Sequence, residues 1–336
     1  MHCSVVILNW NGVDMLRRYL PSVVHHTLTP ANKKQIEVVV ADNGSSDDSL
    51  TLLSEQFPEV RLIPLDRNYG FAEGYNRAIS LIDSDYTVLL NSDVEVTQDW
   101  LTPLLQYMDQ HPQTAACQPK ILSWISHEAG DQPVRFEHAG AAGGLIDLLG
   151  YPYCRGRRMS EVETDHGQYD TIAPVFWTSG AAMCVRTQVY KDLGGLDPDF
   201  FAHMEEIDLC WRMQCQGYQL ICIPQSAVYH LGGGALNYGN PRKTYLNFRN
   251  NLLMLYKNLP ASRLWWVLTC RFLLDYAAAA AFLIKGQTAD MKAVFKARYD
   301  FLKMIPVFRI KRQTLRQNAR VSYPDTISRK FILLSR

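Results

Sequence analysis

The sequence predicts an α/β protein in which helices flank a mostly parallel central sheet and a helical appendage follows at the C-terminus. Two observations support the sheet: short runs rich in Val, Ile and Leu alternate with amphipathic segments, and a polar cluster follows each run. The appendage is indicated by charge, because residues 257–336 hold 16 basic and 4 acidic side chains. With 336 residues, the chain is long enough for one domain of residues 1–258 and a second region of residues 259–336.

Four strands and three helices are expected in the first third of the chain. The strands span residues 4–8, 37–41, 60–65 and 86–90, and the helices span residues 13–24, 47–56 and 72–82. Asp47 and Asp48 would lie in the first turn of the second helix, where the helix dipole favours carboxylates. Ligands bind such sheets at the carboxyl ends of the strands, so the residues that follow each strand are the first candidates for a site.

Beyond the first third, the regular pattern is interrupted once. Residues 123–175 are rich in Gly and aromatic side chains, which predicts an insertion of loops and short strands beside the site. After the insertion we expect regular structure at 176–186, a helix at 204–216, strands at 220–223 and 227–230, and a helix at 245–259. One face of this last helix would be apolar, with Tyr245, Phe248, Leu252, Leu255 and Leu259.

A polar cluster follows each of the four expected strands. The clusters are Asn9 to Gly12, Asp42 to Ser45, Asn68 to Gly70 with Gly74 and Asn76, and Asn91 to Asp93. Any one of them alone would indicate a turn, because Asn, Asp, Gly and Ser are the usual turn residues. Four such clusters at one edge of a sheet indicate a binding site.

The spacing of the cysteines argues against a zinc site, and the first turn argues against a dinucleotide-binding enzyme. The eight cysteines are scattered and none forms a CxxC pair, so a zinc site is not expected. The first turn reads Asn9-Trp10-Asn11-Gly12 in place of GxGxxG, which argues against a nicotinamide-dependent dehydrogenase. The chain begins with a strand and without the features of a signal peptide, so we expect residues 1–258 in the reducing cytosol. Nucleic acid is not expected as a partner.

Seven segments with a fixed order lie within residues 3–258. They read VVILNWNG, VVVADNGSSDDS, NYGFAEGYN, LLNSDVEV, WTSGAAMCVR, GGLDPDFFAHMEEIDLCWR and YHLGGGA. In this order they resemble the family 2 glycosyltransferases, and most of all their bacterial rhamnosyltransferase-like branch. The resemblance implies the GT-A fold, which is Rossmann-like, and inverting transfer of a sugar from a nucleotide-sugar. A nucleotidyltransferase would share a base pocket and a metal aspartate, but would not explain a late acidic cluster together with His230.

The resemblance places the nucleotide at the ends of the first two strands. Asp42 would accept the imide N–H of uracil or thymine, which suits a carboxylate because its oxygens are acceptors. The expected donor is therefore a UDP- or dTDP-sugar, with Asn9 in the same base and ribose pocket. The alternative for Asp42 is an Asx turn before Ser45. The other residues expected in the nucleotide-sugar site are Asn68, Gly70, Gly74, Asn76, Asn91, Ser92, Ser179 and Gly180, together with Arg249, which lies opposite the apolar face of its helix. For Arg249, plain exposure to solvent is the alternative.

Asn91-Ser92-Asp93 matches the family's version of the DxD motif, with Asn in the first acidic position. By that resemblance, Asp93 would bind Mg²⁺ or Mn²⁺, and the ion would neutralise charge on the leaving diphosphate. His230 would reach the ion or the diphosphate, and the glycines at 232–234 would let the backbone approach phosphate closely. Each residue also has a simpler interpretation, a turn for Asp93 and a core histidine for His230.

The chemistry is assigned to Glu205-Glu206-Ile207-Asp208. Relatives usually read Glu-Asp-x-Asp here, and the resemblance makes the second acid the general base, which is Glu206 in this chain. Glu205 and Asp208 would orient the base or hold acceptor hydroxyls. A solvated acidic helix start is the alternative. Because Glu replaces Asp at 206, a catalytically silent protein that only binds nucleotide-sugars is the alternative function.

The C-terminal region predicts association with a membrane. Residues 264–284 are an apolar stretch long enough to span a bilayer, but Arg271 and Asp275 interrupt it. Trp265, Trp266 and Tyr276 suit a headgroup interface. The basic residues that follow are Lys292, Lys296, Arg298, Lys303, Arg309, Lys311 and Arg312. Helices lying in an anionic membrane surface are favoured, with a spanning helix or a soluble helical cap as alternatives. The protein would then act at the cytoplasmic face of the cell membrane, on a glycan or lipid-linked acceptor.

Overall fold

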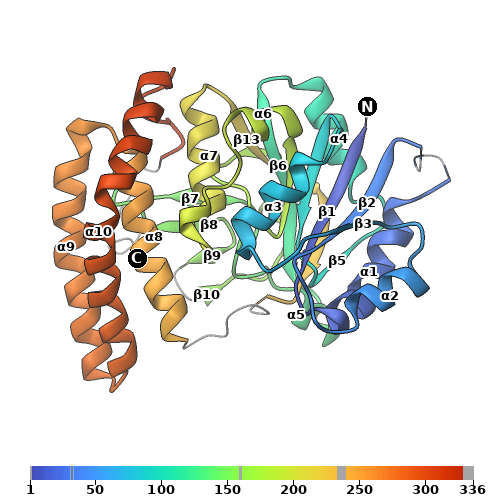
Figure 1. Ribbon diagram of the computed structural model, residues 1–336, viewed down its shortest axis with the longest axis horizontal. Helices are drawn as coiled ribbons and strands as arrows, with labels where there is room; N and C mark the ends of the chain where they lie inside the picture. The colour runs from blue at the N-terminus through green and yellow to red at the C-terminus, as the bar shows by residue number, and fades with distance from the viewer. Residues whose placement is uncertain (1, 31, 33, 159–160, 233–239, 328–336) are drawn as a thin grey trace.

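The computed structural model is an α/β protein built on one large sheet, and it describes residues 2–30, 32, 34–158, 161–232 and 240–327 (Figure 1). The first half of the sheet is parallel, in the order β3-β2-β1-β4. These strands are β1 (Cys3–Asn9), β2 (Ile36–Asp42), β3 (Arg61–Pro64) and β4 (Tyr86–Leu90). All four were expected from the sequence, and their ends shift by at most one residue.

The second half of the sheet mixes strand directions. β12 (Ala182–Arg186) runs antiparallel between β4 and β6 (Thr114–Ser123). β13 (Gln219–His230) pairs in parallel with β6. Two short strands, β5 (Val94–Val96) and β11 (Ala173–Pro174), pair antiparallel with β13. The mostly parallel sheet is confirmed. Where two strands were expected, β13 is continuous and shifts register after Ile223.

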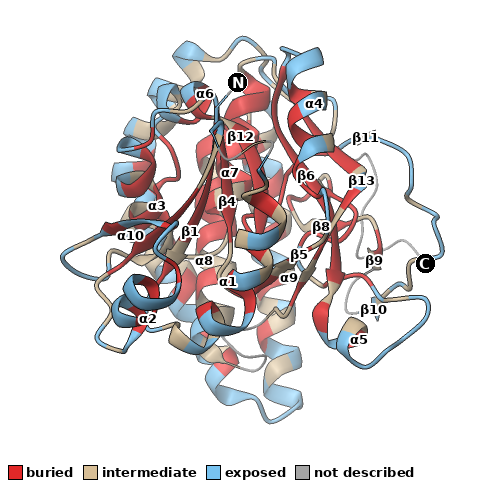
Figure 2. Ribbon diagram, turned by 90° about the vertical axis from the view of Figure 1, so that its right-hand side faces the viewer, coloured by how far each residue is buried: buried red, intermediate tan, exposed pale blue. Residues whose placement is uncertain are grey.

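Both faces of the sheet are covered by helices, because alternate side chains of a strand point to opposite faces. Val5 and Ile7 of β1 belong to the core on one face, and Val6 belongs to the core on the other. The helices on the first face are α1 (Val13–Thr27), α2 (Ser49–Gln56) and α4 (Thr102–Gln110), and those on the second face include α3 (Gly70–Ser80), α7 (Glu205–Cys215) and α8 (Pro241–Asn258). Figure 2 shows the buried strands between helices whose outer faces are exposed.

Several helices begin at residues other than those expected, and for α2 and α8 the structure shows the reason. α2 begins at Ser49 and not at Asp47, because the Asp47 carboxylate accepts hydrogen bonds from the backbone N–H groups of Ser49 and Val13. α8 begins at Pro241, four residues before the expected start, and the Asn240 side chain caps its first turn. Proline suits this position because its fixed φ is already helical and it has no N–H group to leave unpaired.

The expected insertion contains loops, one short helix and a small sheet. The helix is α5 (Trp124–Glu128), and the sheet has the order β10-β9-β8-β7. Its strands are β7 (Gly144–Ile146), β8 (Pro152–Cys154), β9 (Arg157–Arg158) and β10 (Glu161–Val162). The remaining short elements between β11 and α7 are α6 (Thr187–Asp192), which follows β12, and the 3-10 turn η1 (Pro198–Phe200).

The C-terminal helices α9 (Ala261–Ile284) and α10 (Thr288–Asn318) lie beside α8 at one end of the molecule (Figure 1). α10 also belongs to the main core: the buried Phe308 ring lies 5.8 Å from the ring of Phe200 in η1. Lys311 Nζ bonds Asp199 at 2.6 Å and also bonds the carboxylate of Asp197. The boundary expected at residue 258 therefore does not separate two independently packed units.

The two faces of α9 have opposite environments. Arg271 and Asp275, which interrupt its apolar sequence, are buried against the protein, where Arg298 of α10 also bonds Asp275 at 2.6 Å. The outward face is apolar, and its exposed large side chains are Trp265, Trp266, Phe272, Leu273, Leu283 and Ile284. Among the described residues, α9 is the one helix whose length and composition would allow it to cross a membrane. Its charges are thus satisfied inside the protein and its apolar side chains face outward.

Candidate active site

The ends of β1 and β2 bring Asn9 and Asp42 together, since these residues are partners in the parallel ladder. Asn9 Nδ2 donates to Asp42 Oδ2 at 3.0 Å, and the backbone N–H of Ser45 donates to Asp42 Oδ1 at 2.8 Å. The expected Asx turn therefore exists, but each carboxylate oxygen keeps a second lone pair. Asn9 Oδ1 is buried and has no hydrogen-bond partner among the described residues. An unpaired buried acceptor beside a carboxylate fits a ligand that donates hydrogen bonds.

Two of the expected donor-binding residues have structural roles. Asn76 Oδ1 accepts hydrogen bonds from Tyr190 Oη at 2.7 Å and from Leu196 N at 2.9 Å, and its amide donates to Leu196 O. Asn76 therefore joins α3 to the chain before η1, and its contact with the donor stays a prediction. Asn68 Oδ1 similarly accepts from Asn43 Nδ2 and from Gly70 N, which shapes the turn before α3.

The glycines at this edge are required by close packing. Gly70 has a φ of 78°, and a Cβ there would lie 3.1 Å from the ring of Phe201. A Cβ at Gly74 would lie 3.0 Å from both Leu8 and Asn43, so a larger residue would push α3 away from β1 and β2. These positions keep α3 against the strand ends, which explains their place in the motif without a direct contact to a ligand.

Asp93 and His230 lie together because β5 pairs with β13, with Val94 opposite His230. His230 Nε2 is 3.1 Å from Asp93 Oδ1 and 3.4 Å from Asn91 Nδ2, while Ser92 lies in the turn between β4 and β5. Burial opposes a charged imidazole, but the carboxylates of Asp93 and Glu137 outweigh it and raise the pKa of His230 to about 10. The residues of the two motifs that were expected to hold a cation are therefore adjacent.

Glu137 is a member of this cluster that the sequence did not indicate. Its Oε2 lies 3.5 Å from His230 Nδ1, on the side of the ring opposite Asp93. Gly232, with a φ of 70°, packs on it so closely that a Cβ would lie 2.5 Å from Glu137 Oε1. Glu137 comes from the insertion, whose loops have no periodic pattern, so only the three-dimensional structure brings it to the site. Gly233 and Gly234, also expected here, lie outside the described residues.

The arrangement fits a divalent cation that shares its coordination with a ligand. Asp93 offers a carboxylate oxygen. His230 would offer its Nε2 atom once a bound cation displaces the proton that the two carboxylates stabilise in its absence, and Glu137 would then orient the far side of that ring, as outer partners of metal-bound histidines do. Within the described ranges no group of three or more His, Cys, Asp or Glu side chains could hold an ion by itself. Mg²⁺ and Mn²⁺ commonly complete such sites with phosphate oxygens and water. Glu95 does not contribute, since its Oε2 accepts from Trp124 Nε1 at 2.9 Å.

Glu205 and Glu206 open helix α7, which places both carboxyl groups at the positive end of the helix dipole. The Oε2 atom of each is buried and has no hydrogen-bond partner in the part of the chain that is described. Burial raises the pKa of Glu206 to about 6, although backbone N–H groups at the helix start oppose the shift. Burial and the neighbouring Glu206 raise the pKa of Glu205 well above its usual value. A pair in which one acid stays protonated and the other ionises near neutral pH is suited to accepting a proton.

Ser179 and Gly180 lie against this acidic pair. A Cβ on Gly180 would be 3.9 Å from Glu206 Cβ and 3.3 Å from the ring of Phe71, so a small residue leaves space beside the carboxylate. Ser179 is held by its N–H, which donates to Gln118 Oε1 at 2.9 Å, and by its hydroxyl, which donates to Ala139 O. The structure therefore brings the segment expected to line the donor-sugar pocket next to Glu206.

The side chain of Asp208 points from α7 into the protein, where it is fully buried, and does not lie beside that of Glu206. Its Oδ2 accepts from Lys257 Nζ and from Arg212 Nε, both at 2.8 Å, and its Oδ1 accepts from Asn258 Nδ2 at 2.8 Å. Burial opposes its ionisation, but the charges of Lys257 and Arg212 outweigh it and lower the pKa of Asp208. Its charge is thus neutralised inside the protein, and Asp208 fixes α7. Of the two roles expected for it, holding acceptor hydroxyls does not fit this position.

The loop before α7 is strained and is held by α8. Phe201, His203 and Met204 all have positive φ, between 67° and 75°, which costs a non-glycine residue on the order of 1–3 kcal/mol. Asn250, which is fully buried, has its Nδ2 within 2.9 Å of the carbonyl oxygens of Phe200, Ala202 and His203.

Arg249 supports the same loop. Its guanidinium donates to the carbonyl oxygens of Asp199 and Phe200 at 3.2 and 3.1 Å. Arg249 is therefore half-buried and engaged with the protein, in contrast to the solvent-exposed alternative. The side chains at 249 and 250 position the turn from which Glu205 and Glu206 project.

Comparisons with known proteins identify relatives of this chain. Residues 4–127 match the family model described as glycosyl transferase family 2. The chain is 26% identical over 245 residues to the N-acetylglucosaminyl-diphospho-decaprenol L-rhamnosyltransferase of Mycobacterium tuberculosis, in an alignment that covers 67% of this chain and 75% of the relative.

Two solved structures share the fold. S. aureus TarS in complex with UDP-GlcNAc has a TM-score of 0.58 and 15% identity, covering 95% of this chain and 89% of that one. The mannosyltransferase PcManGT from Pyrobaculum calidifontis, in complex with GDP-Man and Mn²⁺, has a TM-score of 0.54 and 14% identity, covering 90% of this chain and 87% of that one. At these identities the likeness extends to the fold alone.

Proposed function

Because this chain is a family 2 glycosyltransferase with a GT-A fold, we propose that it transfers a sugar from a UDP- or dTDP-sugar to a hydroxyl of a glycan or lipid-linked acceptor, with inversion. The observation that carries the proposal is the buried carboxyl of Glu206, with a pKa of about 6 and an unpaired oxygen beside Gly180. A base of that pKa is ionised at neutral pH and still basic enough to accept a proton in the transition state.

In the proposed reaction, Glu206 takes the proton of the acceptor hydroxyl as that oxygen forms its bond to the anomeric carbon. The bond from this carbon to the diphosphate breaks on the opposite face, and the diphosphate leaves with the electron pair. A single displacement of this kind inverts the anomeric configuration. Asp93 and His230 would hold a Mg²⁺ or Mn²⁺ ion, which when bound neutralises charge on the leaving diphosphate. The solved mannosyltransferase with the same fold binds Mn²⁺.

Asn9 and Asp42 form the proposed base pocket. The fold does not choose the nucleotide, since one structure of this fold holds UDP-GlcNAc and another holds GDP-Man. The preference for uracil or thymine instead rests on Asp42, whose carboxylate suits an imide donor, and on the unpaired Asn9 Oδ1 beside it.

Substitution of Asp42 tests the nucleotide. Asp42→Ala is expected to weaken binding of UDP by about 10–100-fold, because a hydrogen bond to a charged group is worth roughly 1.5–3 kcal/mol. Asp42→Asn can still accept the Ser45 N–H and is expected to lose less. Calorimetry with UDP, dTDP and GDP measures the effect, and equal affinity of the unsubstituted protein for all three would contradict the assignment.

We also propose that the outward face of α9 lies in an anionic membrane surface at the cytoplasmic side. A relative acts, by its name, on a lipid-linked acceptor, an N-acetylglucosaminyl-diphospho-decaprenol. Support comes from exposed apolar side chains on a helix whose charges are satisfied inside the protein. The net charge of the region is weaker support than the sequence suggested, because Arg298 pairs with Asp275 of α9, while Lys311 and Arg312 bond residues outside the region.

Trp265 and Trp266 test the membrane contact. The double change Trp265→Ser and Trp266→Ser is expected to reduce sedimentation with phosphatidylglycerol vesicles by about tenfold or more, since each buried aromatic contributes roughly 1.5–3 kcal/mol. Ile125→Ser removes a similarly exposed apolar residue, 62% accessible, from α5 and serves as the control. Equal sedimentation of all three proteins would contradict the interfacial contact. Deleting residues 260–336 is a poorer test, because it removes Phe308 from the core and the bond from Lys311 to Asp199.

A further inference from the structure

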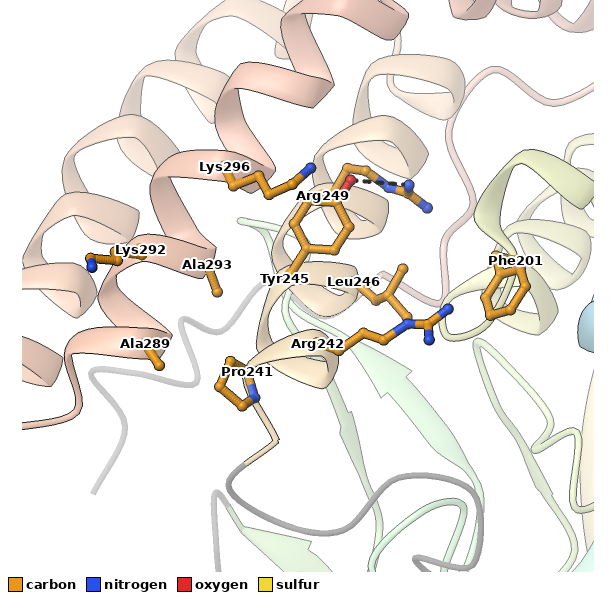
Figure 3. Close-up of a pocket in the computed structure, with 10 residues that line it drawn as sticks. All are labelled: Phe201, Pro241, Arg242, Tyr245, Leu246, Arg249, Ala289, Lys292, Ala293 and Lys296. Carbon is orange, nitrogen blue, oxygen red and sulfur yellow. Dashed lines mark hydrogen bonds between the residues drawn. The ribbon is translucent and has the colours of Figure 1, made fainter.

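A groove of about 610 Å³ lies between the first turns of α8 and α10, with Phe201 at its inner end. Figure 3 shows Arg242 extending from α8 toward Phe201, and Lys296 of α10 lying over the ring of Tyr245. Arg249 bonds Tyr245 Oη at 3.3 Å, so its guanidinium forms part of the same wall. The groove is separate from the Asp93 and His230 cluster, which is built from β4, β5 and β13.

The groove is strongly cationic. Arg242, Arg249, Lys292 and Lys296 line it, and none of the lining residues in the described part of the chain is acidic. Lys296 is neutralised by Asp300, but in the described part of the chain neither Arg242 nor Lys292 pairs with a carboxylate. The N-terminus of α8 adds partial positive charge, whereas that of α10 is offset by the buried Asp290 in its first turn. Two cations without a carboxylate partner among the described residues, the guanidinium of Arg249 and one helix end around one cavity favour an anion.

The surroundings of the groove are apolar. The ring of Phe201 is 44% exposed and contacts the guanidinium of Arg242, whose Cζ lies 5.2 Å from the ring centre. Just before α10, Leu283 and Ile284 at the end of α9 are 53% and 86% exposed. An anionic group in the groove would therefore lie beside an apolar surface that could accompany a hydrocarbon chain toward the membrane.

We propose that this groove binds the phosphate or diphosphate group of the acceptor, which carries an apolar chain. The inference rests on the proposed function, because it assigns a site to the acceptor of that reaction. Phe201 begins the turn that ends in Glu206, and five extended residues span at most about 17 Å. An acceptor held by its phosphate at Phe201 would thus have its sugar within reach of the base. Arg249 joins the two sites, since it lines the groove and bonds the loop that precedes α7.

Binding of a soluble prenyl diphosphate tests the proposal. The full-length protein in detergent is titrated with farnesyl diphosphate in the presence of saturating UDP, alongside the double variant Arg242→Gln with Lys292→Gln. Both residues are exposed, so the variant is expected to fold. Its dissociation constant should rise by about tenfold or more, as expected for the loss of charge-assisted bonds. Arg309→Gln makes the same change of charge at an exposed position of α10 outside the groove and should bind normally.

Further arms identify the source of the phosphate. If inorganic pyrophosphate competes with farnesyl diphosphate, the groove recognises the anion itself, as proposed. If only phosphatidylglycerol vesicles are affected by the double variant, the groove binds membrane headgroups and the acceptor assignment is wrong. Equal weakening by Arg309→Gln, or displacement of farnesyl diphosphate by UDP, would also overturn it. UDP affinity and donor hydrolysis are measured on the same samples. If both are intact but farnesyl diphosphate does not bind as expected, only this inference is wrong. If both are absent, the proposed function is wrong.

Discussion

Replacing Glu206 with Gln is expected to lower the turnover number for sugar transfer by about 10²–10⁴-fold, the usual contribution of one well-placed base. Gln keeps the size and polarity of the side chain but cannot take a proton, so donor affinity should hardly change. The loss should appear in kcat more than in KM. Glu206→Asp restores the residue common in relatives and should be affected only moderately, through the displacement of the carboxylate by one methylene.

The pH dependence gives an independent check on the same residue. Burial raises the pKa of Glu206 to about 6, so the base is ionised above that pH and protonated below it. Activity should therefore fall as the pH drops through about 6, and the Glu206→Gln variant should lose this limb of the profile. Glu205→Gln should reduce transfer less. If Glu205→Gln abolished transfer and Glu206→Gln did not, the two roles would be exchanged. A retained anomeric configuration in the product would reject a single displacement altogether.

Removal of the divalent ion should have an effect of similar size. In EDTA, transfer is expected to fall by at least about 10²-fold and to return with Mg²⁺ or Mn²⁺, since a metal supplies several kcal/mol of charge stabilisation. Asp93→Ala should remain inactive at any metal concentration, because it removes the one carboxylate that faces His230 Nε2. The same variant should bind Mn²⁺ more weakly in the presence of UDP, which electron paramagnetic resonance can measure without turnover.

Glu95→Gln is the matched control for Asp93→Ala. It removes a negative charge two residues away, but from a side chain that bonds Trp124 and not His230. This variant should keep its metal response. Full activity of the unsubstituted protein in chelator would show that side chains alone stabilise the leaving diphosphate, and His230 would be the first residue to consider in that role.

The fold and much of the site could be predicted because they depend on local patterns. Asn9 and Asp42 end short apolar strands and Asp93 follows a third, and parallel pairing of these strands then brings all three residues to one edge of the sheet. Glu137 could not be predicted, because it reaches His230 through an insertion without periodicity. The same limit applies to Asn76, whose motif position suggested a ligand although its amide bonds Leu196 across a large sequence separation.

Sequence patterns also overstated the independence of the C-terminal region. A run of basic residues indicates a charged surface, but the partners of those residues lie far away in the sequence. Lys311 reaches Asp199, and Arg298 reaches Asp275, so these charges are used in packing. Charge counts along a chain therefore cannot distinguish basic side chains that are free to bind an anionic membrane from those that already pair within the protein.

The position of β12 has a consequence for the synthesis of the chain. β4 ends at Leu90 and β6 ends at Ser123, but the strand that fills the gap between them begins only at Ala182. At translation rates of about 5–20 residues per second, the roughly 90 residues between β4 and β12 take about 5–20 s to be made, and the roughly 60 residues between β6 and β12 take about 3–12 s. Until then the facing edges of β4 and β6 expose unpaired backbone groups, which are templates for wrong pairing and aggregation. Slower translation lengthens this period, and a chaperone that covers the exposed strand edges would reduce wrong pairing and aggregation during it.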